Sequence, residues 1–183
     1  MTLPEQIKQK EREISEYYHF GIWNALKFKY HKESKYSTVK HLQVNQGEIW
    51  YCDLGYNVGT EKNKCRPVMV ISNNNINRSE KVVVLCITTA KGKTNANDLP
   101  CQDSWYLLYS ATNDDTKKIK PGRTIRANNT PYNFLDKDSM VQCEEIRAVS
   151  KSRLDRHKKC IGTLNDMDLQ KIKQKFLRTY NFG

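Results

Sequence analysis

Arg66 stands at the mouth of an apolar run and could bind a phosphate. It directly precedes Pro67 in NKCRPVMVISNNN, residues 63–75, where the chain turns abruptly apolar. A guanidinium is planar, always charged and matches phosphate oxygens with its fork of N–H donors. We therefore predict that Arg66 faces a phosphate and stabilises the negative charge that grows on it during a reaction. The plainer alternative is a solvated arginine at the start of a strand.

A pair of hydroxyls, Thr88 and Thr89, ends the apolar run KVVVLCITT, residues 81–89. If this run and the one that Arg66 opens are antiparallel neighbours, the start of one and the end of the other lie at the same edge of a sheet. Arg66 and Thr88 would then meet. RNA brings its own nucleophile, the 2′-hydroxyl, so such a pair could act by positioning and charge stabilisation alone. The alternative is that two threonines only reflect β-propensity.

Other common catalytic groups are missing from the middle of the chain. None of the four histidines lies between residues 47 and 149, so a site built there works without histidine. No compact carboxylate motif for a metal ion appears, although scattered Asp and Glu side chains could converge in space. The six cysteines form no Cys-x-x-Cys pair. We expect neither a metal ion nor another cofactor.

The charge of the chain favours a polyanion or an acidic protein as partner. Lys and Arg number 31 against 20 Asp and Glu, which gives a formal net charge of +11. Residues 150–183 are the most basic segment, with nine basic and three acidic side chains. The N-terminus has no apolar signal-peptide core, and no apolar run approaches the roughly 20 residues of a membrane span. We expect a reduced, soluble, cytoplasmic protein.

Short strands separated by turns begin at residue 46 and predict a small antiparallel barrel. The first strand, GEIWYCDLG, is expected to place Ile49, Tyr51 and Leu54 on one face. Further strands are expected at CRPVMVISN, at KVVVLCITT and at SMVQCEEIRAVSKSRL. DLPCQ, WYLLYS and TIR, residues 124–126, are weaker candidates. These elements would carry the Arg66 and Thr88 pair.

The two ends of the chain predict helices. Residues 4–30 have helical spacing, and residues 31–45 look like a polar linker, so we expect an extension over 1–45 and a second domain over 46–183. Asn165 or Thr163 could cap a last helix. The first helix would present an apolar face formed by Ile7, Ile14, Tyr18, Ile22 and Leu26. The last would present one formed by Leu169, Ile172, Phe176 and Tyr180.

Several of these segments, in order, resemble one known family. GEIWYCDLGYNVGTEKNKCRPVMVISNN is similar to the opening of the MazF/PemK family of toxin ribonucleases, with its Gly-Ser/Thr-Glu loop and Arg-Pro-Val-x-Val-Ile strand. VVVLCITTAK resembles the next strand of that family, and DLPCQ its Leu-Pro-Thr-His segment. DSMVQCEEIRAVSKSRL resembles the late block of the family. The resemblance runs from Gln46 to Phe182.

This resemblance implies a fold and an activity. The fold is mainly β with helices, an SH3-like curved β-barrel of the MazF/PemK/CcdB type. Family members are usually homodimers that cut single-stranded RNA, usually mRNA, at short motifs without a metal ion. The 2′-hydroxyl attacks and leaves a 2′,3′-cyclic phosphate and a 5′-hydroxyl. A cognate antitoxin lays an acidic tail over the RNA groove, and DNA would be contacted only through a toxin–antitoxin complex.

The resemblance also assigns roles to residues of this chain. Arg66 matches the catalytic arginine and Thr88 the catalytic threonine. Glu145 stands where many relatives have an amide that reads a base, and an ionised carboxylate cannot donate. Gln102 replaces a histidine of the Leu-Pro segment. The residues expected to contact RNA are Thr60, Glu61, Lys62, Ser72, Asn73, Thr89, Gln102, Glu144 and Glu145.

Two questions stay open on the sequence alone. The segment 104–136 is longer than in compact relatives, and it is either a solvated loop or an extension of the RNA groove. It carries the cations Lys117, Lys118, Lys120, Arg123 and Arg126. The alternatives to a ribonuclease are a CcdB-like toxin that binds DNA gyrase without cutting RNA, and a silent RNA-binding regulator. The pair Arg66 and Thr88 favours the nuclease.

Overall fold

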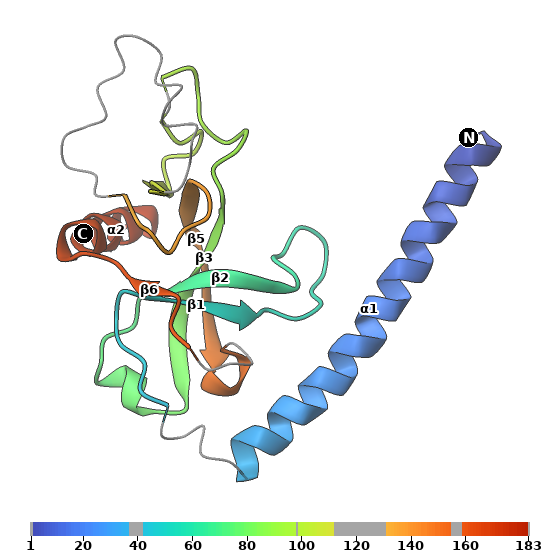
Figure 1. Ribbon diagram of the computed structural model, residues 1–183, viewed down its shortest axis with the longest axis horizontal. Helices are drawn as coiled ribbons and strands as arrows, with labels where there is room; N and C mark the ends of the chain where they lie inside the picture. The colour runs from blue at the N-terminus through green and yellow to red at the C-terminus, as the bar shows by residue number, and fades with distance from the viewer. Residues whose placement is uncertain (1, 37–41, 98, 112–130, 155–158, 183) are drawn as a thin grey trace.

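A six-stranded antiparallel sheet is the centre of this computed structural model, which describes residues 2–36, 42–97, 99–111, 131–154 and 159–182 (Figure 1). The sheet order is β4-β5-β3-β2-β1-β6. A long helix precedes the sheet and a shorter one follows it. The elements are α1 (Leu3–Tyr36), β1 (Glu48–Asp53), β2 (Cys65–Val70), β3 (Lys81–Thr89), β4 (Trp105–Leu108), β5 (Ser139–Ser150), β6 (Gly162–Thr163) and α2 (Asp166–Thr179). The expected curved, mainly β fold with two terminal helices is confirmed.

Both faces of the sheet are buried near its centre. Trp50 and Cys52 of β1 pack into one apolar cluster with β2 and β3. Ile49 points to the other face, where it shares a second cluster with Ile172 of α2. The expectation that Ile49, Tyr51 and Leu54 form one apolar face was wrong, since Tyr51 is exposed and Leu54 packs in the first cluster with Trp50. The second cluster includes Ile49 but not Tyr51, whereas the first cluster includes Trp50 and Cys52, which point to the opposite face of β1.

Strand β5 contains a bulge that bends it across the sheet. Leu85 of β3 pairs with Ile146, whereas the next residue, Cys86, pairs with Gln142. Cys143, Glu144 and Glu145 therefore have no opposite residue on β3. Extra residues on one strand bend it and re-aim its side chains. Of the two carboxylates in this bulge, Glu145 lies beside Lys62 of the loop 55–64.

Helix α2 is fixed by its first turn. The side chain of Asn165 accepts a hydrogen bond from the backbone N–H of Asp168 at 2.8 Å, which confirms the predicted cap. Asp168 is buried and accepts from the hydroxyls of Tyr106, at 2.7 Å, and Tyr132, at 2.6 Å. Burial, followed by these hydrogen bonds, raises the pKa of both phenols. One carboxylate thus ties α2 to β4 and to the segment before β5.

Helix α1 is longer than expected and packs through a different face. It runs to Tyr36, so the first part of the predicted linker is helical, and Val44 at the end of that linker is buried. The side chain polarity of residues 31–36 misled the prediction, since these residue types are compatible with a helix. The predicted apolar face is mostly exposed, including Ile7 and Ile14. None of the described helices is long and apolar enough to cross a membrane.

The contact between α1 and the rest of the chain is aromatic. Trp23 lies directly over Gly55, where an added Cβ would come within 2.6 Å of the indole. The Tyr30 hydroxyl donates to Asp53 at 3.0 Å. The Arg153 guanidinium covers the other part of Trp23, 5.1 Å from the ring centroid. Figure 1 shows α1 and α2 on opposite sides of the sheet.

Some sequence-based expectations concern residues outside the described ranges. These are the short strand at residues 124–126 and the five cations of the 104–136 segment. WYLLYS supplies β4, as expected. DLPCQ forms no strand in its described part, where Pro100 makes only an isolated bridge to Thr94. The boundary between an extension over 1–45 and a domain over 46–183 stays a prediction.

Candidate functional site

Arg66 and Thr88 lie at one edge of the sheet. Strands β2 and β3 pair in an antiparallel register in which Val68 is opposite Cys86 and Met69 is opposite Leu85. Continuing this register by two residues places Arg66 opposite Thr88. Both side chains are partly exposed, so the edge is open to a ligand. The predicted pairing of the two strands is confirmed.

The Arg66 side chain is held by the loop that precedes it. Its Nε donates to the backbone oxygen of Asn63 at 2.8 Å. The Asn63 side chain in turn accepts from the backbone N–H of Asn57 at 2.6 Å, which closes the loop 55–64 on itself. A guanidinium fixed through Nε can still present its two terminal nitrogens as a fork. Within the described part of the chain, neither of these two nitrogens has a hydrogen-bond or ion-pair partner.

Lys93 is a member of this site that the sequence reading missed. Its Nζ donates to Thr88 Oγ1 at 3.1 Å and to the backbone oxygen of Thr89 at 3.0 Å. A turn after β3 brings it back, with Gly92 at φ +71° and the Lys93 N–H bonded to Ala90. The signal was present in the sequence as Lys-Gly-Lys directly after the paired threonines and Ala90.

Three cations crowd this edge. The pKa of Lys93 is lowered, first by burial of its ammonium group and then by the positive charges of Lys62 and Arg66. Like charges held close together attract an anion, and only Lys62 of the three has a carboxylate beside it among the described residues. An RNA phosphate would relieve this repulsion. The edge therefore has the electrostatics of an anion site.

Two ion pairs connect the loop 55–64 to β5. Lys62 Nζ lies 3.8 Å from a carboxylate oxygen of Glu145, and Arg147 lies 3.6 Å from Glu61. Cys86 lies beneath these charges and is fully buried. Burial raises the pKa of its thiol to about 11, although Arg147 opposes the shift. A neutral, buried thiol is no nucleophile, so Cys86 serves packing.

The two carboxylates of the bulge have different surroundings. Glu145 faces Lys62 and therefore borders the cationic edge. Glu144 accepts a hydrogen bond from the indole N–H of Trp105, and its backbone oxygen accepts from the Tyr180 hydroxyl at 3.0 Å. Glu144 is thus held by β4 and by the end of α2. Of the two, Glu145 is the better placed to meet a ligand at Arg66.

The remaining expected contact residues are divided between two ends of the sheet. Thr60 is exposed in the loop 55–64, and Gln102 is exposed next to Cys101, whose N–H bonds to the Lys93 oxygen at 2.9 Å. Ser72 and Asn73 lie past the far end of β2, about 20 Å of extended chain from Arg66. The Ser72 hydroxyl is buried and bonded to Asn77. We leave Ser72 and Asn73 out of the site.

A family model covers the whole sheet and α2. Residues 45–179 match the model described as PemK-like, MazF-like toxin of type II toxin-antitoxin system. The chain belongs to this family. The match begins after α1, so the long N-terminal helix is an addition to the part that family members share.

Solved structures of similar fold include several toxins of this family. An endoribonuclease from a mycobacterial species, in complex with its cognate antitoxin, is 18% identical, with a TM-score of 0.50, and the match covers 76% of this chain and 97% of that one. The Mycobacterium tuberculosis toxin MazF-mt6 is 15% identical, with a TM-score of 0.47 over 73% and 96% of the chains. MazF from Deinococcus radiodurans is 15% identical, with a TM-score of 0.46 over 75% and 96%. At these identities the likeness concerns the fold.

Proposed function

We propose that this family member is an endoribonuclease toxin that cuts single-stranded RNA, with mRNA as its usual substrate. The single observation that supports this most is the meeting of Arg66, Thr88 and Lys93 at one open edge of the sheet. Phosphate recognition needs cations with directed donors, and this edge supplies a fork and an ammonium group. Family membership and the endoribonucleases of similar fold support the same activity.

The proposed reaction uses the nucleophile of the substrate. The 2′-hydroxyl loses its proton as its oxygen forms a bond to phosphorus, and the bond from phosphorus to the 5′-oxygen breaks. The 5′-oxygen takes up a proton, so that a 2′,3′-cyclic phosphate and a 5′-hydroxyl result. Arg66 binds the non-bridging oxygens and stabilises the charge that accumulates on them. Thr88 adds a hydrogen bond. Lys93 is a positioning residue that fixes the Thr88 hydroxyl and adds positive charge to the edge.

Sequence selectivity is proposed to come from the loop 55–64 and the β5 bulge. Lys62 and Glu145 lie next to each other at the edge where the bases on either side of a bound phosphate would pass. Glu145 accepts hydrogen bonds and cannot donate them while ionised. It would therefore favour bases that present amino or imino N–H groups. Thr60, Glu61, Thr89, Gln102 and Glu144 complete the proposed RNA surface.

The proposed partners follow from the same chemistry. An antitoxin would inhibit by covering the cationic edge with acidic residues, and the solved toxin–antitoxin complex of similar fold is the model for this. We also propose that the protein acts as a homodimer in the cytoplasm and contacts DNA only as part of a toxin–antitoxin complex.

The deciding experiment compares wild type with Arg66→Ala on a long single-stranded RNA in excess EDTA, with the ends mapped by sequencing. We expect discrete cuts with 5′-hydroxyl ends from wild type and none from the variant. Arg78→Ala is the matched control, because Arg78 lies in the short 3-10 helix Ile76–Arg78 at the far end of β2 and is exposed. Full activity of Arg66→Ala would refute the mechanism. No cleavage by folded wild type would instead favour gyrase binding or silent RNA binding.

A further inference from the structure

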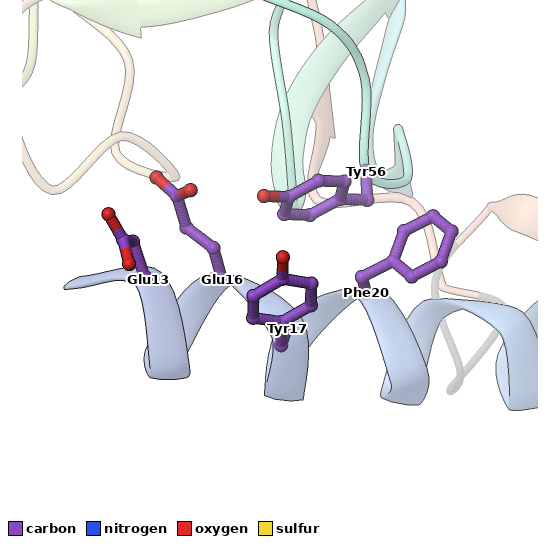
Figure 2. Close-up of a pocket in the computed structure, with 5 residues that line it drawn as sticks. All are labelled: Glu13, Glu16, Tyr17, Phe20 and Tyr56. Carbon is purple, nitrogen blue, oxygen red and sulfur yellow. The ribbon is translucent and has the colours of Figure 1, made fainter. Parts of the chain in front are cut away.

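Helix α1 and the loop 55–64 enclose a pocket that the proposed reaction does not use. It encloses about 240 Å³ and is lined by Glu13, Glu16, Tyr17, Phe20 and Tyr56 (Figure 2). Pockets for drug-sized ligands hold roughly 300–1,000 Å³. This pocket is smaller, and its size suits a single side chain or a group of similar size.

The lining combines aromatic rings with carboxylates. Phe20 and Tyr56 meet edge to face, with ring centroids 5.6 Å apart and an interplanar angle of 72°. Figure 2 shows Glu13 and Glu16 on one side of the rings, with the carboxylate of Glu16 beside the hydroxyl end of Tyr56. The two glutamates are three residues apart on α1 and so share one face of the helix.

This combination selects a cation. Aromatic faces attract positive charge through their quadrupole, and carboxylates add direct electrostatic attraction. A phosphate would meet two negative charges and be repelled, so RNA is excluded here. Among organic cations the guanidinium fits best, because it can stack on a ring with its plane while its edge donates to a carboxylate. We infer that this pocket binds the arginine side chain of a partner protein.

The same helix already binds two cations of its own chain in this way. Arg153 lies 5.1 Å from the ring centroid of Trp23, and Lys32 lies 4.9 Å from that of Phe28. No cation of the described residues pairs with Glu13 or Glu16. Glu13 accepts only a hydrogen bond from the Gln9 side chain at 3.3 Å. In a chain with a net charge of +11, this pocket is acidic, and none of the cations in the described ranges forms an ion pair with its two carboxylates.

An occupant of the pocket would touch the loop that borders the proposed active site. Tyr56 is the second residue of the loop 55–64, and Lys62 of that loop pairs with Glu145. The pocket and the cationic edge therefore involve different residues of one loop. A partner arginine would bind on the α1 side and leave the RNA side free.

The test uses the full chain and a minimal probe, N-acetyl-arginine amide, followed by NMR of the aromatic resonances. We expect saturable shifts of the Tyr17, Phe20 and Tyr56 rings, with a Kd in the millimolar range typical of one such contact. The double variant E13Q/E16Q should bind at least tenfold more weakly. Phe20→Leu, which removes the ring and keeps an apolar side chain, should weaken binding severalfold.

Matched controls keep the result specific. The double variant E5Q/E11Q makes the same change of charge on the same exposed helix outside the pocket and should bind like wild type. N-acetyl-citrulline amide has nearly the shape of arginine without its charge and should not bind. The inference is overturned if the citrulline compound binds as well as the arginine compound, or if no saturable shifts appear. It is also overturned if E13Q/E16Q keeps the wild-type affinity, or if N-acetyl-lysine amide, measured in the same way, binds more tightly than the arginine compound.

Discussion

Lys93 Nζ lies 3.1 Å from the Thr88 hydroxyl oxygen, and the same ammonium group holds the backbone oxygen of Thr89 at 3.0 Å. One lysine thus fixes both the side chain and the backbone at the end of β3. Because the Thr88 oxygen accepts from Lys93, the hydroxyl hydrogen stays available to donate to a phosphate. Lys93 and Thr88 therefore form one hydrogen-bonded unit.

This relationship predicts the effect of removing the ammonium group. Lys93→Met keeps most of the side-chain volume and should lower cleavage by about 10²-fold, because the Thr88 hydroxyl loses its partner and the edge loses a charge. Thr88→Ala should cost a similar factor, and the double variant should lose little more, since the two act together. The measurement is single-turnover cleavage of a short RNA. Independent, multiplying effects would show that Lys93 does not act through Thr88.

The pH dependence of cleavage should carry the signature of Lys93. Its pKa is lowered, first by burial and then by Lys62 and Arg66. The charged form is needed, so its contribution is complete below this lowered pKa and is lost as pH rises through it. The alkaline decline should therefore begin at a lower pH than an ordinary lysine would give. Lys93→Arg should move the decline upward, and an unchanged alkaline limb would assign it to another group.

The packing of Trp23 on Gly55 predicts a difference between two glycine substitutions. Gly55 has φ +91° and Gly59 has φ +62°, so alanine is strained at both positions. Only at Gly55 would the new Cβ strike the indole, whereas at Gly59 nothing lies within 4 Å. Gly55→Ala should therefore reduce the free energy of unfolding by about 1–3 kcal/mol more than Gly59→Ala does.

Urea denaturation checks this comparison, with both variants measured in the same buffer. Trp23→Ala in the Gly55→Ala background should recover much of the extra loss, because the clash is removed. Equal losses at Gly55 and Gly59 would mean that α1 does not rest on this loop in solution.

Asp168 should be far more important to stability than its neighbour on the same helical turn. Asp168→Ala leaves the buried Tyr132 hydroxyl and the partly buried Tyr106 hydroxyl without their acceptor and should cost about 2–5 kcal/mol of unfolding free energy. Asp166 is exposed in the first turn of α2, and Asp166→Ala should cost less than about 1 kcal/mol. Thermal and urea unfolding give both numbers. Similar losses for the two variants would contradict the network around Asp168.

Much of the frame of the site could be predicted from local patterns. Adjacent apolar runs joined by a short loop determine an antiparallel pair, and that pair brings Arg66 toward Thr88. The cap at Asn165 follows from a short side chain placed directly before a helical apolar pattern. Each of these depends on neighbours in the sequence, which is why reading the sequence succeeded.

Three features of the structure were not predicted, because they depend on tertiary contacts that the spacing of apolar residues does not show. Lys93 reaches Thr88 only because Gly92 turns the chain with a positive φ. The face of α1 that packs is the one with Trp23 and Tyr30, although a second apolar stripe had the clearer spacing. The β5 bulge was missed because a pattern of apolar and polar residues does not show which residue of a neighbouring strand each one faces. In all three cases the missing information was tertiary.

In a regular strand, every residue faces a partner on the neighbouring strand, so its side chain and the pairing of the strand are linked. The bulge in β5 separates the choice of side chain from the pairing. Leu85 pairs with Ile146 and Cys86 pairs with Gln142, so Glu144 and Glu145 take no part in the pairing of β5 with β3. Substitutions at Glu144 and Glu145 can accumulate without re-registering the sheet, so this stretch is free to diverge between related toxins. The preference for one RNA recognition sequence over another could then evolve one residue at a time while the fold stays the same.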